Sequence, residues 1–219
     1  MSLTHSFSSI KMYENCPKRY YHQRITKEVK DTGSDATRYG ERVHEDLEHR
    51  LVKAKPLSKE TESYEALCKS IENMVGEGEL YAEKQLCLNE NLTPTGWWAD
   101  DAWLRSILDV LIIVDDKAIV MDWKTGKRRP DFTQLQMFAL QVFKHFPHVK
   151  KVQSTFIWLK DMSLDSETFK ESQTNLLWAD LLARIGRIQE SEAHDNWPAR
   201  PSGLCNWCPA KNICEFARI

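Results

Sequence analysis

Apolar residues recur every three to four positions over the first third of the chain, which predicts amphipathic helices. In the first of them, Phe7, Ile10 and Tyr13 share one face, with Ser6 or Ser8 as a candidate cap. Proline at position 17 is expected to start a further turn or helix. The helices predicted in this part of the chain cover residues 7–24, about 34–54 and 59–75.

Beyond residue 80 the pattern changes to short runs rich in β-branched and aromatic residues, which predict strands. A helix is expected from Pro130 and Asp131 to about His145, and another over residues 172–192. The predicted strands cover residues 80–88, 107–114, 118–123 and 149–159, with a short one at 167–170. This order predicts an α/β or α+β fold in one domain, built on a mixed sheet.

Composition and charge narrow the class of protein. Hydrophobic residues make up 42% and charged residues 28% of 219, which is ordinary for a globular chain and argues against disorder. The formal net charge of −2 excludes a uniformly basic coat but allows a local basic groove. No apolar run is long enough to cross a membrane, and the first residues lack a signal-peptide pattern. We therefore expect a cytoplasmic protein without a membrane partner, whose six cysteines are mostly reduced thiols or metal ligands.

Two acids and a lysine come together in a predicted hairpin. If Asp115 and Asp116 form its turn, Asp109 lies opposite Asp122, and Lys124 follows two residues later on the same face. Two carboxylates at so short a distance raise each other's pKa unless a cation lies between them. Their hard oxygens suit Mg²⁺ or Mn²⁺. The alternative is a solvated hairpin face that carries a surface ion pair.

Two further residues are candidates for this site. His44 lies on the second helix, four residues after Gly40, where a helical glycine suggests close packing. A lone histidine is more often a surface or core residue, and the next one, His49, is one position too late for an H-E-x-x-H zinc motif. Gln134 follows Asp131 by three positions, which fits a capping box and an amide facing the acids equally well.

The cysteines suggest a second metal centre. Three thiols form C-x2-C-x5-C near the C-terminus and one lies near the N-terminus: Cys205, Cys208, Cys214 and Cys16. Four thiolates suit either a [4Fe–4S] cluster or a zinc ion. The remaining two, Cys68 and Cys87, fall in a predicted helix and a predicted strand and are interpreted as small core residues.

Taken together, these motifs resemble the iron–sulfur branch of the RecB-like PD-(D/E)XK nucleases. That branch includes CRISPR-associated adaptation nucleases, AddB-type nuclease domains and stand-alone phage exonucleases. The resemblance rests on an opening S-x-S-x-I-x2-Y-x2-C-P-x2-Y from Ser6, G-x3-H from Gly40, D-x-K-T-G-K from Asp122 and the closing cysteines. Gln134 begins the family's Q-L-x-x-Y motif, but Phe138 replaces its tyrosine, so that hydroxyl is lost or moved.

The resemblance implies a restriction-endonuclease-like core, a mixed central β-sheet flanked by helices, with a [4Fe–4S] cluster tying the N- and C-termini. It implies a single nuclease domain over residues 1–219. Residues 1–30 and 197–219 would form the cluster-binding module around the four terminal cysteines, and residues 34–195 the nuclease core.

The implied activity is a divalent-metal-dependent deoxyribonuclease, an exonuclease acting on single- or double-stranded DNA ends in recombination, repair or phage DNA processing. His44, Asp109, Asp122 and the backbone carbonyl of Trp123 would hold Mg²⁺ or Mn²⁺. The side chains that would act on the attacking water and the phosphate are Lys124 and Gln134. The residues expected to contact the DNA backbone are Lys127, Arg128 and Arg129, for which a solvated turn is the alternative.

A non-cleaving module that grips DNA ends for a helicase or recombinase partner is the competing hypothesis. The intact acids and Lys124 count against it. A nucleotide-driven motor is not indicated, because Thr125-Gly126-Lys127 lacks the preceding G-x4 of a P-loop.

Overall fold

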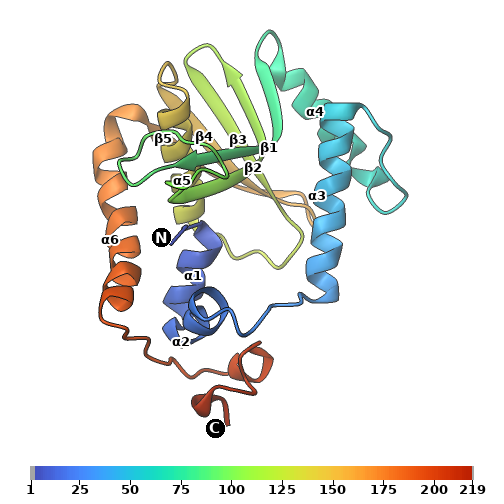
Figure 1. Cartoon of the computed structure of the whole chain (residues 1–219). Helices are drawn as coiled ribbons and strands as arrows, with labels where there is room; N and C mark the ends of the chain where they lie inside the picture. Colours follow the sequence, from blue (N-terminus) through green and yellow to red (C-terminus); the bar gives the residue numbers. More distant parts are fainter. Residues whose placement is uncertain (1–2, 219) are drawn as a thin grey trace. The chain divides into compact units, whose positions relative to one another are not determined.

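A computed structural model describes residues 3–218, in which sequential strands form one five-stranded sheet of order β1-β2-β3-β4-β5 (Figure 1). The strands are β1 (Glu79–Leu88), β2 (Leu104–Val114), β3 (Lys117–Lys124), β4 (Lys151–Trp158) and β5 (Ser163–Lys170). Only β3 and β4 pair in parallel, because a helix connects them and returns the chain to the same edge. The predicted mixed sheet flanked by helices is confirmed.

The helices also lie close to their predicted positions. Those of the sheet region are α3 (Asp35–Lys53), α4 (Glu65–Val75), α5 (Phe132–His145) and α6 (Thr174–Ala193), with short 3₁₀ turns at Glu62–Tyr64 and Glu171–Gln173. The expected helix over 7–24 is three segments: α1 (Phe7–Asn15), α2 (Pro17–Tyr20) and a π-helical turn, Tyr21–Ile25. The break lies at the extended residue Cys16, since Pro17 disfavours helical backbone in the residue before it. No helix within residues 3–218 is long and apolar enough to cross a bilayer.

Each face of the sheet is covered by different helices. Helix α5 packs its apolar side, including Leu135 and Phe138, against Leu111 and Val120 on one face. Helices α3 and α4 cover the other face, where Leu47 and similar side chains meet residues of β2 and β3. The sheet is therefore the middle of three layers, and the side chains of its central strands are buried on both sides.

The pairing of β2 with β3 stops part-way along both strands. The predicted register is confirmed from Val114↔Lys117 to Val110↔Met121, and pairing ends there. Beyond this point β2 pairs only with β1, while β3 continues beside β4. The sheet thus forks, and Asp109 is the first residue of β2 inside the fork. The simple hairpin predicted that Asp109 and Asp122 form a ladder pair on a common face. This prediction is wrong, because the pairing ends one position earlier.

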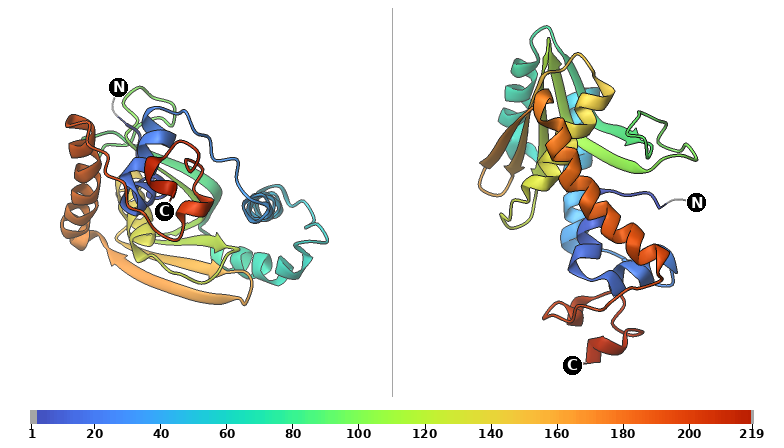
Figure 2. Two further views of the ribbon diagram at one scale, coloured as in Figure 1. Left: turned by 90° about the horizontal axis from the view of Figure 1, so that it is seen from below. Right: turned by 90° about the vertical axis from the view of Figure 1, so that its left-hand side faces the viewer.

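The in–out alternation of β2 is also interrupted at Asp109. Leu108 and Leu111 both belong to the core beneath α5, whereas strict alternation would place them on opposite faces. In β1, Glu83 lies opposite Asp109, because the pairs on either side keep one register, and its φ is 47°. The residues that follow β1, 89–103, project from the sheet as a long connection to β2 (Figure 2).

The chain divides into two compact units. The first comprises Ser34–Trp178 with the N-terminal residues through Thr4, and it contains the whole sheet. The second comprises His5–Gly33 and the residues from Ala179 onward. The second unit therefore combines a segment near the N-terminus with the C-terminal part of the chain, which includes the short 3₁₀ turns Cys205–Trp207 and Glu215–Arg218.

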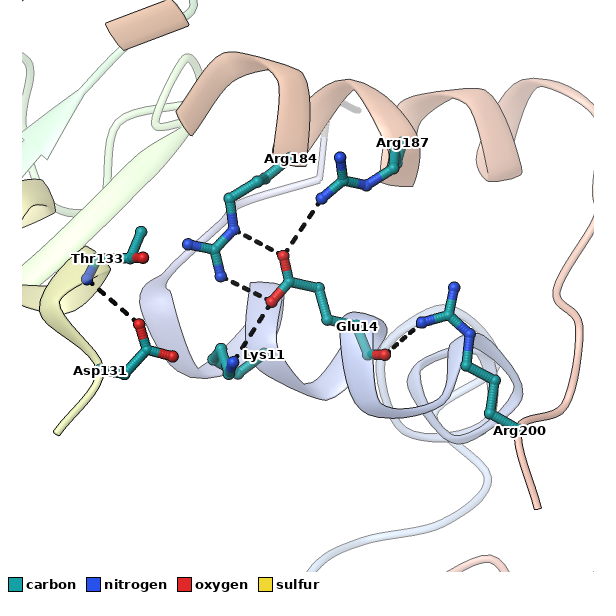
Figure 3. Close-up of polar contacts among 7 residues, drawn as sticks. All are labelled: Lys11, Glu14, Asp131, Thr133, Arg184, Arg187 and Arg200. Atoms are coloured by element: carbon teal, nitrogen blue, oxygen red, sulfur yellow. Dashed lines mark hydrogen bonds and ion pairs between the residues drawn. The ribbon is translucent and has the colours of Figure 1, made fainter. Parts of the chain in front are cut away.

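Aromatic stacking and one partly buried acid hold the second unit together. The ring of Tyr20 stacks on Trp197 with centroids 5.8 Å apart. Glu14 accepts two hydrogen bonds of 2.6 Å from Arg184, and its backbone carbonyl accepts one from Arg200 (Figure 3). Burial raises the pKa of Glu14, but the hydrogen bond and charge of Arg184 lower it below the usual value overall. Glu14 thus links α1 to α6 and to the C-terminal tail.

Gly78 allows β1 to begin against β2, and its replacement by alanine should destabilise the first unit. A Cβ there would lie 2.3 Å from the carbonyl oxygen of Ile113, and backbone atoms cannot rotate away. We expect Gly78→Ala to lower the free energy of unfolding by about 2 kcal/mol in urea denaturation followed by circular dichroism. Gly126→Ala is the control, since a Cβ there meets nothing within 4 Å. Equal stability of the two variants would contradict this packing.

Candidate active site

Asp109 joins the two branches of the fork. Its Oδ2 accepts the backbone N–H of Trp123 at 2.7 Å, although the side chain is almost fully buried. Its Oδ1 lies 3.2 Å from Nδ1 of His44 on α3. One carboxylate therefore fixes the end of β3 and holds the imidazole of a helix that packs on the sheet.

Glu83 completes a three-residue cluster. Ligand atoms of His44, Glu83 and Asp109 all lie within 4.8 Å of one another, and the Nδ1–Oε1 distance from His44 to Glu83 is 3.9 Å. Sequence reasoning missed Glu83, because its position depends on the register between β1 and β2. The long connection over residues 89–103 leaves that register open, and no motif marks the residue.

A second set of side chains comes from the β3 branch and α5. Lys124 Nζ lies 2.5 Å from Asp122 Oδ2 and donates to Gln134 Oε1 at 3.1 Å. Gln134 Nε2 in turn donates to Asp122 Oδ1 at 3.1 Å. The three groups form a closed triangle, so the amide of Gln134 orients the acid and the lysine. The cap of α5 is made by Asp131, whose side chain accepts the N–H of Thr133 (Figure 3).

The site carries more negative charge than its own cations balance. Burial and the charge of Asp109 raise the pKa of Asp122, against the opposing charge of Lys124. Burial and the charge of Asp109 also raise the pKa of Glu83 to about 7. Burial lowers the pKa of His44, but the hydrogen bond and charge of Asp109 raise it overall. One imidazole nitrogen among carboxylate oxygens is a donor set that fits a divalent cation such as Mg²⁺ or Mn²⁺.

Gly40 lets α3 bring His44 to the site. A Cβ at Gly40 would lie 3.1 Å from Oγ1 of Thr125, the residue after Lys124. The close packing predicted from this helical glycine is confirmed. Beside it lies a cleft of about 520 Å³. The residues that line the cleft are Ala36, Thr37, Gly40, Glu41, His44, Glu45, Glu48, Glu83 and Thr125.

Comparison with known proteins identifies this arrangement. The model of the PD-(D/E)XK nuclease superfamily matches residues 4–215. The chain belongs to this superfamily. Nucleases of the superfamily use divalent metals, in agreement with the donor set of the cleft. No curated protein matches the chain.

Two solved structures resemble this nuclease at low sequence identity. A putative exonuclease from Eubacterium rectale is 11% identical, with a TM-score of 0.54, and the match covers 97% of this chain and 89% of that one. The crystal structure of SSO0001 is 14% identical, with a TM-score of 0.42, over 100% of this chain and 89% of that one. The first of these supports the nuclease fold.

The basic residues that follow β3 do not form one uniform patch. Arg128 makes two hydrogen bonds, of 2.9 and 2.6 Å, to Asp165 of β5. Asp165 also accepts the indole N–H of Trp158 at 2.8 Å. Arg128 is therefore paired within the nuclease, whereas Lys127 and Arg129 are exposed. That these three residues contact DNA stays a prediction.

All four predicted cluster cysteines line one pocket of the second unit. The backbone N–H groups of Arg200 and Ser202 donate to the sulfurs of Cys16 and Cys205 at 3.4 and 3.3 Å. The side chains of Arg19 and Arg200 line the same pocket. Within residues 3–218, no three cysteine sulfurs lie within 4.8 Å of one another.

The other two cysteines are core residues, as predicted. Cys68 is fully buried between α4 and the sheet, and Cys87 is 2% exposed. Burial raises the pKa of the Cys68 thiol to about 11 and also raises that of Cys87. Both are therefore protonated and unreactive near neutral pH.

The raised pKa values make the metal-free nuclease less stable as pH rises. Glu83, Asp122 and His44 hold protons more tightly in the folded chain, so the stability they contribute at low pH is lost as pH rises. For Glu83 this loss runs from about pH 4.5 to 7, for Asp122 it begins near pH 3.8 and for His44 near pH 6.5. In EDTA, we expect the free energy of unfolding to fall over this range. Glu83→Gln should remove part of that fall, on the order of 1 kcal/mol.

The same variant tests whether Glu83 belongs to the metal site. Mn²⁺ should raise the melting temperature of the wild type, and Glu83→Gln should weaken its apparent affinity by about tenfold, or 1.4 kcal/mol. Glu45→Gln is the matched control, because Glu45 lines the same cleft but lies outside the three-residue cluster. Equal Mn²⁺ affinity of Glu83→Gln and the wild type would exclude Glu83 as a ligand.

Proposed function

We propose that this nuclease is a divalent-metal-dependent exonuclease that hydrolyses phosphodiester bonds at DNA ends. The observation that carries the proposal is the Lys124–Asp122–Gln134 triangle beside the His44–Asp109 pair. A lone ion-pair network would not need an imidazole and three acids around one cleft. A hydrolytic centre needs both a cation site and a fixed positive charge next to it.

The metal ligands we assign are His44, Asp109 and Asp122, with the backbone carbonyl of Trp123. Glu83 is added from the geometry of the cluster. A bound Mg²⁺ or Mn²⁺ would supply the Lewis acidity that polarises the phosphate and acidifies a water molecule. The chain's own part is to hold these donors on four separate elements, α3, β1, β2 and β3, that meet at the fork.

Lys124 has a different role, because a protonated amine cannot ligate a cation. Its ammonium group lies beside Asp122 and is held there by Gln134. From this position it stabilises the charge that develops on the phosphate oxygens and orients the attacking water. The ring of Phe156, with its centroid 5.0 Å from Nζ, excludes solvent from one side of the amine.

The preference for DNA ends is supported by a structural neighbour, the protein from Eubacterium rectale that is named as a putative exonuclease. The wall of the cleft formed by α3 carries Glu41, Glu45 and Glu48, which repel a phosphate backbone laid along it.

Lys124→Ala separates chemistry from metal binding. We expect cleavage of labelled DNA in Mn²⁺ to fall at least 100-fold, since a fixed charge at the transition state is lost. The Mn²⁺-induced rise in melting temperature should persist. Lys117→Ala, an exposed lysine at the opposite end of β3, is the control and should cut at a rate close to wild type. Wild-type cleavage by Lys124→Ala would refute the assigned role.

We also propose that the second unit holds a [4Fe–4S] cluster on Cys16, Cys205, Cys208 and Cys214, which would place this nuclease in the RecB-like iron–sulfur branch. The support is their shared pocket and the N–H donors aimed at two of the sulfurs. Four thiolates around one pocket suit either a [4Fe–4S] cluster or one zinc ion, and metal analysis decides between them.

Metal analysis of protein purified without oxygen tests this centre. We expect about four irons per chain and a brown colour, with iron lost in each of the four ligand Cys→Ser variants. Cys68→Ser and Cys87→Ser are controls that should keep their iron, because both thiols are buried in the first unit. One zinc per chain and no iron would show a zinc site in place of the cluster. The absence of both iron and zinc would overturn the proposal.

A further inference from the structure

An exposed tryptophan stands in the connection between β1 and β2. Trp98 is 83% exposed, although burying an indole is among the most favourable contacts a chain can make. The guanidinium carbon of Arg105 lies 5.4 Å from its ring centroid and 5.1 Å from that of Trp97. The arginine thus supports one side of the indole and leaves most of the ring open to solvent.

The connection is held in place by its own hydrogen bonds. Asp101 accepts from Thr95 Oγ1 at 2.6 Å and from Asn89 Nδ2 at 3.2 Å. The backbone N–H of Trp103 donates to Leu88 at 3.0 Å, which closes the base of the connection. Trp98 is therefore presented by a braced loop, so its exposure follows from the fold of the connection.

Arg105 links the indole of Trp98 to β2, the strand that carries Asp109 of the metal site. Arg105, Ile107 and Asp109 alternate along β2 and share one face, four residues from end to end. This corresponds to about 14 Å at about 3.4 Å per residue. Ile107 between them is 40% exposed, so this face of the strand is open. A strand of nucleic acid held at the metal would reach Trp98 within a few nucleotides.

We propose that Trp98, supported by Arg105, is a binding site for one unpaired base of single-stranded DNA. This inference rests on the proposed nuclease function and adds a base-stacking residue outside the metal site. Bases in a duplex already stack on one another and cannot offer a free face to an indole. The cation of Arg105 attracts the phosphates that flank the stacked base.

Binding of short single-stranded oligonucleotides in EDTA tests the contact without cleavage. We expect Trp98→Ala to weaken binding about tenfold, as loss of one base–aromatic stack does, and Trp98→Phe to keep most of the affinity. A single abasic site moved along the oligonucleotide should weaken wild-type binding most at one position. With the abasic site at that position, Trp98→Ala and the wild type should bind with equal affinity, because the missing base already removes the stack.

Trp207→Ala is the matched control, since Trp207 is 78% exposed but belongs to the second unit. It should keep the wild-type affinity and the wild-type abasic profile. Wild-type affinity and profile in Trp98→Ala would overturn the proposal and leave the indole as a contact for another protein. A loss of equal size in Trp207→Ala would overturn it as well.

Turnover at saturating DNA in Mn²⁺ separates this inference from the nuclease proposal. Trp98→Ala should cut single strands at the wild-type maximal rate, with only the half-saturating DNA concentration raised. A wild type that shows the abasic profile but cuts no DNA would defeat the nuclease function and leave the stacking contact standing. Normal cutting with equal half-saturation for both proteins would defeat the stacking contact. Faster cutting of blunt duplex than of single strands by the wild type would defeat the single-stranded substrate. Both outcomes leave the nuclease function standing.

Discussion

The hydrogen bond from the backbone N–H of Trp123 to the carboxylate of Asp109 is the contact on which the site depends. In an uninterrupted hairpin that N–H would pair with a carbonyl of β2. Because a side chain takes the place of the carbonyl, β2 and β3 separate after Val110↔Met121 without leaving the N–H unsatisfied. The resulting fork lets acids from two branches of the sheet and a histidine from α3 meet.

This arrangement is costly without a cation. Asp109 and Asp122 are both almost fully buried, and Glu83 lies close to His44 and Asp109. Their mutual repulsion opposes folding at neutral pH, and the energy is recovered when a divalent ion neutralises them. The well-packed layers beneath α5 and α3 provide the stability that allows this crowding. The crowded acids thus lower the free energy of unfolding of the metal-free protein and raise its affinity for the metal.

Much of the fold and part of the site could be predicted from the sequence. The Asp115-Asp116 turn defined the β2–β3 register, so the proximity of Asp109 and Asp122 was predicted correctly, although their exact pairing was not. The capping interpretation of Gln134 could not be rejected, because one amide in the first turn of a helix can serve either purpose. Only the position of Lys124 decides between them.

Contacts between strands joined by long connections, or between a loop and a distant edge strand, could not be predicted. Glu83 depends on the β1–β2 register across residues 89–103. The pairing of Arg128 with Asp165 depends on how far β5 extends. β5 begins at Ser163, whereas alternation indicated only residues 167–170, because its exposed face carries little apolar signal.

Anomalous diffraction from crystals of Lys124→Ala grown with Mn²⁺ and a short single-stranded DNA tests the central claim most directly. The account predicts a manganese peak in the fork, in contact with His44, Asp109 and Asp122, with a DNA phosphate bound to the same ion. Manganese at that place without a phosphate would support the cation site alone. A fork without manganese, or DNA bound away from it, would contradict the account.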